Sequence, residues 1–227
     1  MNVIECNELA KSFGKVAALS NLSLAIEPDK ITGIIGPNGA GKTTFLKIIS
    51  GFLAPSAGEI KVFAENPFNS LLVSANAIYL DDSMPLPAAM PLADIFDAAG
   101  AFYPGWDGGL AKRLLAYFEI NPRATYPALS RGKKSTFTSI LGIAARCPLT
   151  MFDEPTTGMD AAVRKDFYRA LLKDYLQHPR TILLSSHLLN EIQDILEDVL
   201  LINAGTKVLH QPIAELKEYA VGLRGRA

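Results

Sequence analysis

The sequence has little cysteine, no long apolar run and almost no net charge, and each absence excludes a class of protein. Its 227 residues include only two cysteines, Cys6 and Cys147, too few and too far apart for the disulfide framework of a small secreted domain. We expect both to be reduced and structural. No run of about 18 apolar residues occurs, so we expect no membrane-spanning helix. Glu5 and Glu8 interrupt the N-terminus where a signal peptide needs an apolar segment.

The charge balance argues against a protein that binds nucleic acid. The formal net charge is -1, from 22 Lys and Arg against 23 Asp and Glu. Neutralising nucleic-acid phosphates needs clustered basic residues and usually leaves a basic domain. We therefore expect no nucleic-acid partner. Hydrophobic residues form 49% of the chain, and this apolar composition favours a parallel sheet that is buried on both faces.

Strand and helix patterns alternate in a way that predicts an α/β fold with parallel strands. From about residue 83 to residue 145 the strand signals stop and helical periodicity replaces them. We therefore expect a single domain over residues 1–227, with a helical subdomain at about 83–145 inserted in an α/β core. The predicted elements are short strands within 3–26, strands at 31–35, 58–63, 76–80, 149–152 and 181–185, helices at 44–50, 110–118, 135–145, 161–176 and 213–219, and a hairpin at 199–210.

A glycine-rich turn between a predicted strand and a predicted helix has the pattern of a phosphate-binding loop. GPNGAGKT at residues 36–43 matches G-x-x-x-x-G-K-[ST] in the context that gives this motif its meaning. Its glycines let backbone N–H groups approach a phosphate, while Lys42 supplies charge and Thr43 offers a hydroxyl to Mg²⁺. The alternative is a glycine-rich turn that merely begins a helix. The predicted nucleotide-binding residues are Gly36, Pro37, Asn38, Gly39, Ala40, Gly41, Lys42, Thr43 and Thr44.

Two adjacent carboxylates end a second buried strand, LTMFDE at residues 149–154. The first carboxylate of such a pair can hold a metal ion, and the second can take a proton from water. We therefore predict that Asp153 is a metal ligand and that Glu154 is a general base.

Four segments together resemble the ATPase subunits of ABC transporters, in that family's order and spacing. They are GPNGAGKTT at 36–44, LSRGKKS at 129–135, MFDEPTTGMD at 151–160 and SSH at 185–187. The resemblance extends over essentially the whole chain, and no NKxD motif supports a GTPase. It implies an ABC-type P-loop NTPase with a RecA-like core, an N-terminal antiparallel β subdomain and a helical subdomain. It also implies that ATP and Mg²⁺ bind between two such subunits, which drive a separate transmembrane permease from the cytoplasmic face of the membrane.

The resemblance suggests roles for further residues. Phe13 falls where the family places an aromatic ring that stacks on adenine, although it also fits a core residue at a strand end. His187 falls where the family's histidine meets the γ-phosphate and acts in catalysis together with Lys42 and Glu154. Ser130 and Gly132 would reach ATP bound to the partner subunit. Asp160 would cross the dimer interface, and it also suits a helix N-cap.

The sequence departs from the family pattern in two places. The usual LSGGQ signature reads LSRGK, and Arg131, Lys133 and Lys134 either attract phosphate or simply form a solvated basic helix start. Asp81 and Asp82 stand where most relatives have Pro-Gln. We predict that Asp82 contacts Mg²⁺, the alternative being a turn residue. With FYPGWD at 102–107, these departures resemble a bacterial exporter subgroup whose ATPases are often encoded beside GntR-type regulators.

Two other functions fit part of this pattern. One is a soluble ABC protein that acts on DNA or ribosomes, which a coiled-coil insertion or strong basic charge would favour. The other is an ATP-binding regulatory module that is not coupled to transport, which the altered signature suggests. Glu154 favours an enzyme that hydrolyses ATP.

Overall fold

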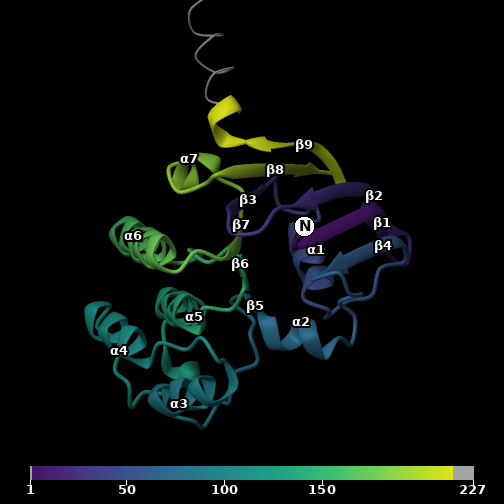
Figure 1. Cartoon of the computed structure of the whole chain (residues 1–227). Helices are drawn as coiled ribbons and strands as arrows, with labels where there is room; N and C mark the ends of the chain where they lie inside the picture. The colour runs from purple at the N-terminus through teal and green to yellow at the C-terminus, as the bar shows by residue number, and fades with distance from the viewer. Residues whose placement is uncertain (1, 217–227) are drawn as a thin grey trace, which may run out of the picture. The chain divides into compact units, whose positions relative to one another are not determined.

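The computed structural model describes residues 2–216 and divides into two compact units (Figure 1). The first unit takes in the chain up to Ser74 and from Thr181 onward, and the second runs from Ala75 to Arg180. Most elements lie within one or two residues of the predicted ranges.

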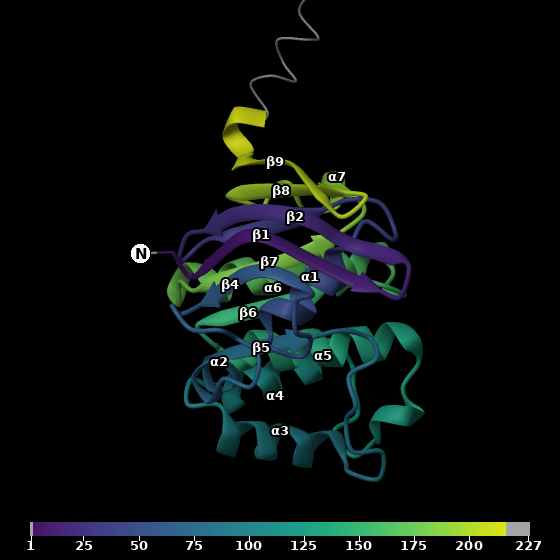
Figure 2. The same ribbon diagram turned by 90° about the vertical axis from the view of Figure 1, so that its right-hand side faces the viewer.

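An antiparallel sheet occupies the N-terminal part of the first unit (Figure 2). It contains β1 (Ile4–Phe13), β2 (Val16–Ile26) and β4 (Ala57–Val62), in the order β2-β1-β4. Buried and exposed residues alternate at the start of β1, as expected for a strand with one face against a core. The predicted N-terminal antiparallel sheet is confirmed.

Parallel strands form the rest of this unit's framework. β3 (Ile31–Ile35) lies between β7 (Thr181–Ser186) and β8 (Asp198–Asn203) and runs parallel to both. β9 (Thr206–Pro212) pairs with β8 in the antiparallel direction. All residues of β3 and β7 are buried, which explains why their sequences are apolar runs without alternation. The helix α1 (Lys42–Ile49) follows β3 after the glycine-rich turn.

The second unit is organised around one helix. α5 (Arg131–Ala145) is buried at every position from Ser135 onward and contacts both strands and three other helices of this unit. Gly142 allows this close packing, because a Cβ atom there would lie 2.6 Å from the ring of Phe152. The other elements are β5 (Ala77–Leu80) and β6 (Leu149–Asp153), which pair in parallel, α3 (Leu92–Phe102), α4 (Gly108–Tyr117), a 3₁₀ turn (Tyr126–Ala128) and α6 (Ala161–Gln177).

Some elements differ from the prediction. α5 begins four residues earlier than expected, because the Ser130 hydroxyl accepts a hydrogen bond from the Lys133 N–H and caps the helix. The short helices α2 (Leu71–Asn76) and α7 (Leu189–Ile192) were not predicted. The predicted helix at 213–219 lies partly outside the described residues.

The cysteines agree with the prediction. Cys6 and Cys147 are free and buried, and burial raises the pKa of each thiol to about 12. Among the described residues, no helix combines the length and apolar character that crossing a bilayer requires.

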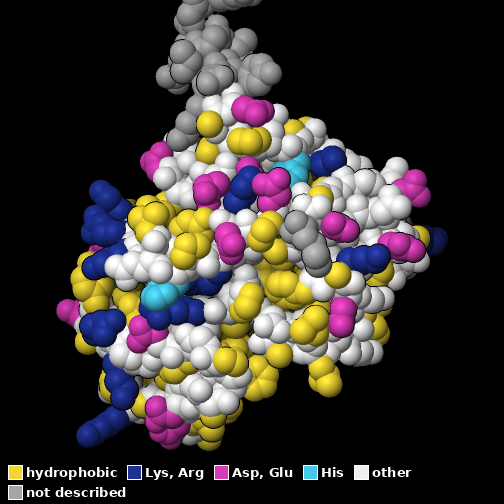
Figure 3. Space-filling view, in the orientation of Figure 1, with side chains coloured by type: hydrophobic (Ala, Val, Ile, Leu, Met, Phe, Trp, Pro, Cys, Tyr) yellow, Lys and Arg dark blue, Asp and Glu magenta, His cyan; other side chains and the backbone are white. Residues whose placement is uncertain are grey.

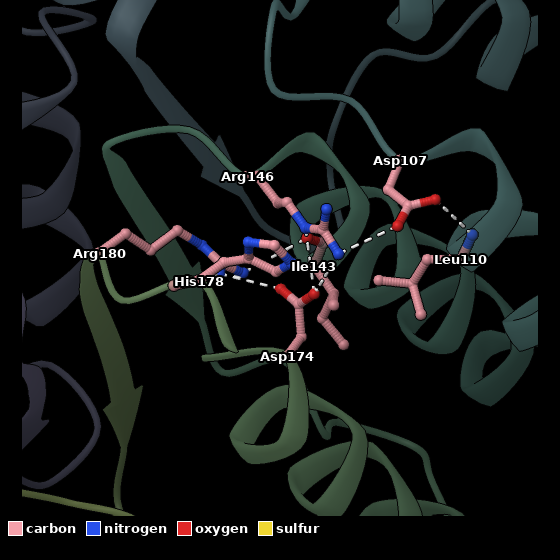
Figure 4. A network of polar contacts seen from close by, with 7 residues as sticks. All are labelled: Asp107, Leu110, Ile143, Arg146, Asp174, His178 and Arg180. Atoms are coloured by element: carbon pink, nitrogen blue, oxygen red, sulfur yellow. Dashed lines mark hydrogen bonds and ion pairs between the residues drawn. The ribbon is translucent and has the colours of Figure 1, made fainter. Parts of the chain in front are cut away.

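A network of charged side chains joins three helices of the second unit (Figure 4). Arg146, which ends α5, contacts Asp107 Oδ2 at 3.0 Å and Asp174 Oδ1 at 2.7 Å through its Nη2. Arg180 forms an ion pair with Asp174 Oδ2 at 2.9 Å. The N–H of Leu110 and the charge of Arg146 hold the pKa of Asp107 below its usual range. The network therefore links the start of α4 to α5 and α6.

Candidate functional site

The glycine-rich turn between β3 and α1 forms a cradle of backbone groups. Gly39 and Gly41 have φ values of 79° and 105°, which side chains rarely tolerate. A Cβ atom at Gly36 would overlap the carbonyl oxygen of Ile202. Pro37, Asn38 and Gly39 are exposed at the tip of the turn. The backbone of this segment can therefore approach a ligand closely, as a phosphate-binding loop requires.

Lys42 begins α1 and points back into the turn. Its Nζ donates hydrogen bonds to the carbonyl oxygens of Gly36 at 2.7 Å and Pro37 at 3.2 Å, and the residue is only 5% exposed. The positive end of the helix dipole adds to this charge. Thr43 is exposed beside it. The site thus combines a held ammonium group, backbone donors and a hydroxyl, which suits a polyphosphate.

Two further predicted residues lie in the same unit. Ser186, the last residue of β7, pairs with Ile35 at the end of β3, so the exposed His187 follows directly beside the start of the cradle. Phe13 ends β1 and is 49% exposed. The ammonium of Lys11 lies 5.2 Å from its centroid. The interpretation of Phe13 as a core residue is wrong.

The strand-end carboxylates lie in the second unit. Asp153 ends β6 and is 6% exposed, and its Oδ2 accepts a hydrogen bond of 2.9 Å from the hydroxyl of Tyr79 in β5. Tyr79 was not among the residues predicted from the sequence. In the sequence it is recognisable only as a tyrosine in a predicted strand, and the structure shows that this strand pairs with β6.

Glu154 has a strained backbone. Its φ of 49° places a non-glycine residue in the left-handed region, at the point where the chain leaves β6. Such strain costs of order 1–3 kcal/mol and tends to be kept at functional sites, because the surroundings must enforce it. This conformation turns the chain directly after Asp153, the last residue of β6.

The altered signature begins α5. Ser130 caps this helix and is exposed, so its hydroxyl already has a local partner. A Cβ atom at Gly132 would overlap the carbonyl oxygen of Gly158, in the loop after Glu154. Close packing within this chain therefore requires a glycine at position 132, independently of any contact with a partner subunit.

Gly132→Ala is expected to destabilise the protein by about 1–3 kcal/mol, because the added methyl group meets backbone that cannot move cheaply. Thermal denaturation followed by circular dichroism measures this loss. Gly109→Ala is the matched control, since it also adds a methyl group to a helix and the nearest atom is a flexible Arg113 nitrogen at 3.2 Å. Equal melting temperatures for the two variants would contradict the packing argument.

The two departures from the family pattern contact each other. Asp82 Oδ2 lies 3.1 Å from Nη2 of Arg131, and both side chains are substantially exposed. The negative charge of Asp82 is thus balanced by the positive charge of Arg131 in the signature. Asp82 remains a predicted metal contact, and it would have to leave this ion pair to serve as one.

Asp160 caps α6. Its Oδ1 accepts hydrogen bonds of 2.9 Å from the N–H groups of Ala162 and Val163. The N-cap role proposed as one alternative is confirmed. Its position at a dimer interface stays a prediction.

Mg²⁺ fits the donor types present in the two units. No group of three or more His, Cys, Asp or Glu side chains within residues 2–216 forms a metal cage. Mg²⁺ does not need one, because it is usually held by one or two protein oxygens together with substrate phosphates and water. The Thr43 hydroxyl and the buried Asp153 carboxylate are such hard oxygen donors.

A cavity of about 520 Å³ in the second unit contains none of the predicted site residues. Residues of α4 and α6 line this cavity. Lys and Arg side chains gather over these two helices, on the left of Figure 3. Asp107 and Asp174 contribute to its wall, and both carboxylates are already paired in the network of Figure 4. We assign this cavity no part in nucleotide binding.

Comparisons with known proteins identify the family of this chain. The ABC transporter family profile matches residues 19–157, well over half of the chain. The chain is 30% identical over 216 residues to "ABC transporter ATP-binding protein YtrB" of Bacillus subtilis, covering 95% of this chain and 74% of that protein. It is 26% identical to "Nod factor export ATP-binding protein I" of Cupriavidus metallidurans, covering 97% and 74%. It spans only 40% and 42% of two longer relatives from Methanosarcina species.

A solved structure confirms the predicted fold class. The dimeric ATP-binding cassette MJ0796 in a post-hydrolysis state with ADP and Pi aligns with a TM-score of 0.79 at 19% identity, covering 92% of this chain and 98% of that one. At this identity the likeness concerns the fold. Together with the family profile and the Bacillus relative, it shows that the chain belongs to the family of ABC transporter ATP-binding proteins.

Proposed function

We propose that this chain is the ATP-hydrolysing subunit of an ABC exporter and that it drives a separate transmembrane permease from the cytoplasmic face of the membrane. The observation that carries the proposal is Glu154, a carboxylate held by a strained backbone directly after the buried Asp153. A general base is needed to hydrolyse ATP and not to bind it.

Each candidate site residue has a separate role in the proposed hydrolysis. Lys42 and the backbone of the cradle would bind the β- and γ-phosphates, and Thr43 and Asp153 would hold Mg²⁺, which would neutralise phosphate charge. Glu154 takes a proton from water as the water oxygen attacks the γ-phosphorus, and the bond from that phosphorus to the β–γ bridging oxygen breaks. His187 donates a hydrogen bond to the transferred phosphoryl group.

A second copy of the chain or a related ATPase subunit would complete the site. Ser130 and Gly132 at the start of α5 would face ATP held by the partner, as a two-fold dimer makes both contacts equivalent. The MJ0796 cassette, which is dimeric in its post-hydrolysis state with ADP and Pi, supports this arrangement.

The direction of transport rests on similarity. The name of the Cupriavidus relative refers to export, and the altered signature, Asp81-Asp82 and the segment at residues 102–107 together resemble the GntR-linked exporter subgroup. The aromatic Phe102 in this segment is 64% exposed, which suits a contact with a permease. Co-purification of a membrane subunit, with phosphate release stimulated by it, tests the proposal. A regulatory module that is not coupled to transport would show no such stimulation.

Lys42→Ala is expected to weaken ATP binding about 10- to 100-fold, because a charge-assisted hydrogen bond to phosphate contributes roughly 1.5–3 kcal/mol. Fluorescent-nucleotide titration measures this affinity. Lys47→Ala, in the last turn of the same helix, should leave the affinity unchanged. An unaltered dissociation constant for Lys42→Ala would contradict the phosphate-cradle assignment.

A further inference from the structure

Tyr79 connects the end of β6 to the loop that follows β5. Its hydroxyl lies 2.9 Å from Asp153 Oδ2 and 3.1 Å from Asp81 Oδ2, so two carboxylates face one phenol oxygen. The residue is 7% exposed. Ser83 also holds Asp81, because its N–H donates to Oδ1 at 3.0 Å and its hydroxyl donates at 2.9 Å to Oδ2, the oxygen that Tyr79 also contacts.

A phenol has one proton, so Tyr79 can donate fully to only one of the two carboxylates at a time. Burial raises the pKa of Tyr79, and the charges of Asp153 and Asp81 raise it further, so the hydroxyl remains a donor. The shorter of the two contacts, 2.9 Å, is the one to Asp153 Oδ2, so this carboxylate is the one that the Tyr79 hydroxyl holds most directly.

The contacts of Tyr79 differ from those of an ordinary core tyrosine. A buried hydroxyl needs only one partner, which a backbone carbonyl or a water molecule can supply. Here both partners of the hydroxyl are carboxylates, and each either is a candidate site residue or lies next to one in the sequence. Asp153 is a predicted metal ligand, and Asp81 precedes Asp82, which pairs with Arg131 of the signature.

We propose that Tyr79 is a positioning residue, which holds the Asp153 carboxylate in its metal-binding orientation and links it through Asp81 to the loop at residues 81–83. This inference rests on the proposed function, because it assigns Asp153 to the metal. It adds a residue that acts on the metal only through another side chain. Hydrogen-bond partners of metal ligands typically change metal affinity 10- to 100-fold when they are removed.

Tyr79→Phe removes the hydroxyl and keeps the ring. With ADP bound, we expect the variant to bind Mn²⁺, a spectroscopic substitute for Mg²⁺, about tenfold more weakly in electron paramagnetic resonance titrations. Its affinity for ADP in the presence of EDTA should stay within about twofold of the wild type, since the cradle is untouched. A purely structural role would lower the melting temperature and leave the Mn²⁺ affinity unchanged.

Tyr117→Phe is the matched control. The Tyr117 hydroxyl also donates to a carboxylate, Asp166 Oδ2 at 2.8 Å, but this pair is exposed and lies on α4 and α6. Its loss should leave Mn²⁺ binding unchanged. Equal Mn²⁺ affinities for wild type and Tyr79→Phe would overturn the inference alone, whereas a wild-type protein that binds no ADP would overturn the proposed function.

A second measurement keeps the inference testable if Tyr79→Phe does not fold. With 3-fluorotyrosine at position 79, we expect the ¹⁹F resonance to move when Mg²⁺ is added to the ADP-bound protein. The same label at position 117 should show no such change. An unmoved resonance at position 79 under saturating Mg²⁺ would overturn the inference.

Discussion

Glu154→Gln is expected to lower steady-state phosphate release about 10²- to 10⁴-fold while ATP still binds. The amide keeps the size of the side chain but cannot take a proton from water. Because a general base contributes mainly to the transition state, the affinity for ATP should change little. If dimerisation depends on bound ATP, the variant should also accumulate as an ATP-bound dimer.

The chain offers a close control for this substitution. Glu119 in the same unit has a left-handed backbone with φ 52°, against 49° for Glu154, and it lies after α4. Glu119→Gln therefore makes the same chemical change in a similarly strained backbone, and it should leave phosphate release unaltered. Near-normal phosphate release by Glu154→Gln would show that Glu154 is not the general base. Size-exclusion chromatography with ATP tests the accumulated dimer.

The features near the candidate site on which sequence and structure agree are those that depend on local chain geometry. The segment from Gly36 to Thr43 needs glycines at positions with positive φ, followed directly by a helix start, and both features are visible in a short run of residues. Asp153 and Glu154 follow an apolar strand, and an end of a buried strand is also a local signal. The N-cap of α6 by Asp160 is a third example.

Side-chain pairs between distant segments could not be predicted in this way. Asp82 and Arg131 are 49 residues apart, and Tyr79 and Asp153 are 74 residues apart. Hydrophobic periodicity assigns residues to faces of helices and strands but does not bring particular polar atoms together. The resemblance to the family did not help at Asp82 and Arg131, because both depart from its pattern. Their pairing becomes visible only once β5 and α5 are folded.

Asp174 is the clearest case of a structural role that the sequence conceals. It lies on α6 with only 5% of its side chain exposed, between Arg146 and Arg180 (Figure 4). Arg180 is 4% exposed, and desolvation lowers its pKa against the opposing charge of Asp174. In the sequence, Lys173-Asp174 resembles an ordinary charged stretch on a solvated helix face. The buried Arg180 and the partly buried Arg146, which also contacts Asp107, instead both pair with this carboxylate.

Asp174→Ala is therefore expected to destabilise the protein by about 3–5 kcal/mol, the usual cost of leaving a buried charge without its partner. For a chain of this size the melting temperature should fall by roughly 6–20 °C. Asp166→Ala is the control on the same helix, where the exposed pair with Arg169 at 2.8 Å should contribute no more than about 1 kcal/mol. Thermal denaturation by circular dichroism separates the two. If both variants melt at the same temperature, the charges at Arg146 and Arg180 are solvated and the network does not hold the three helices together.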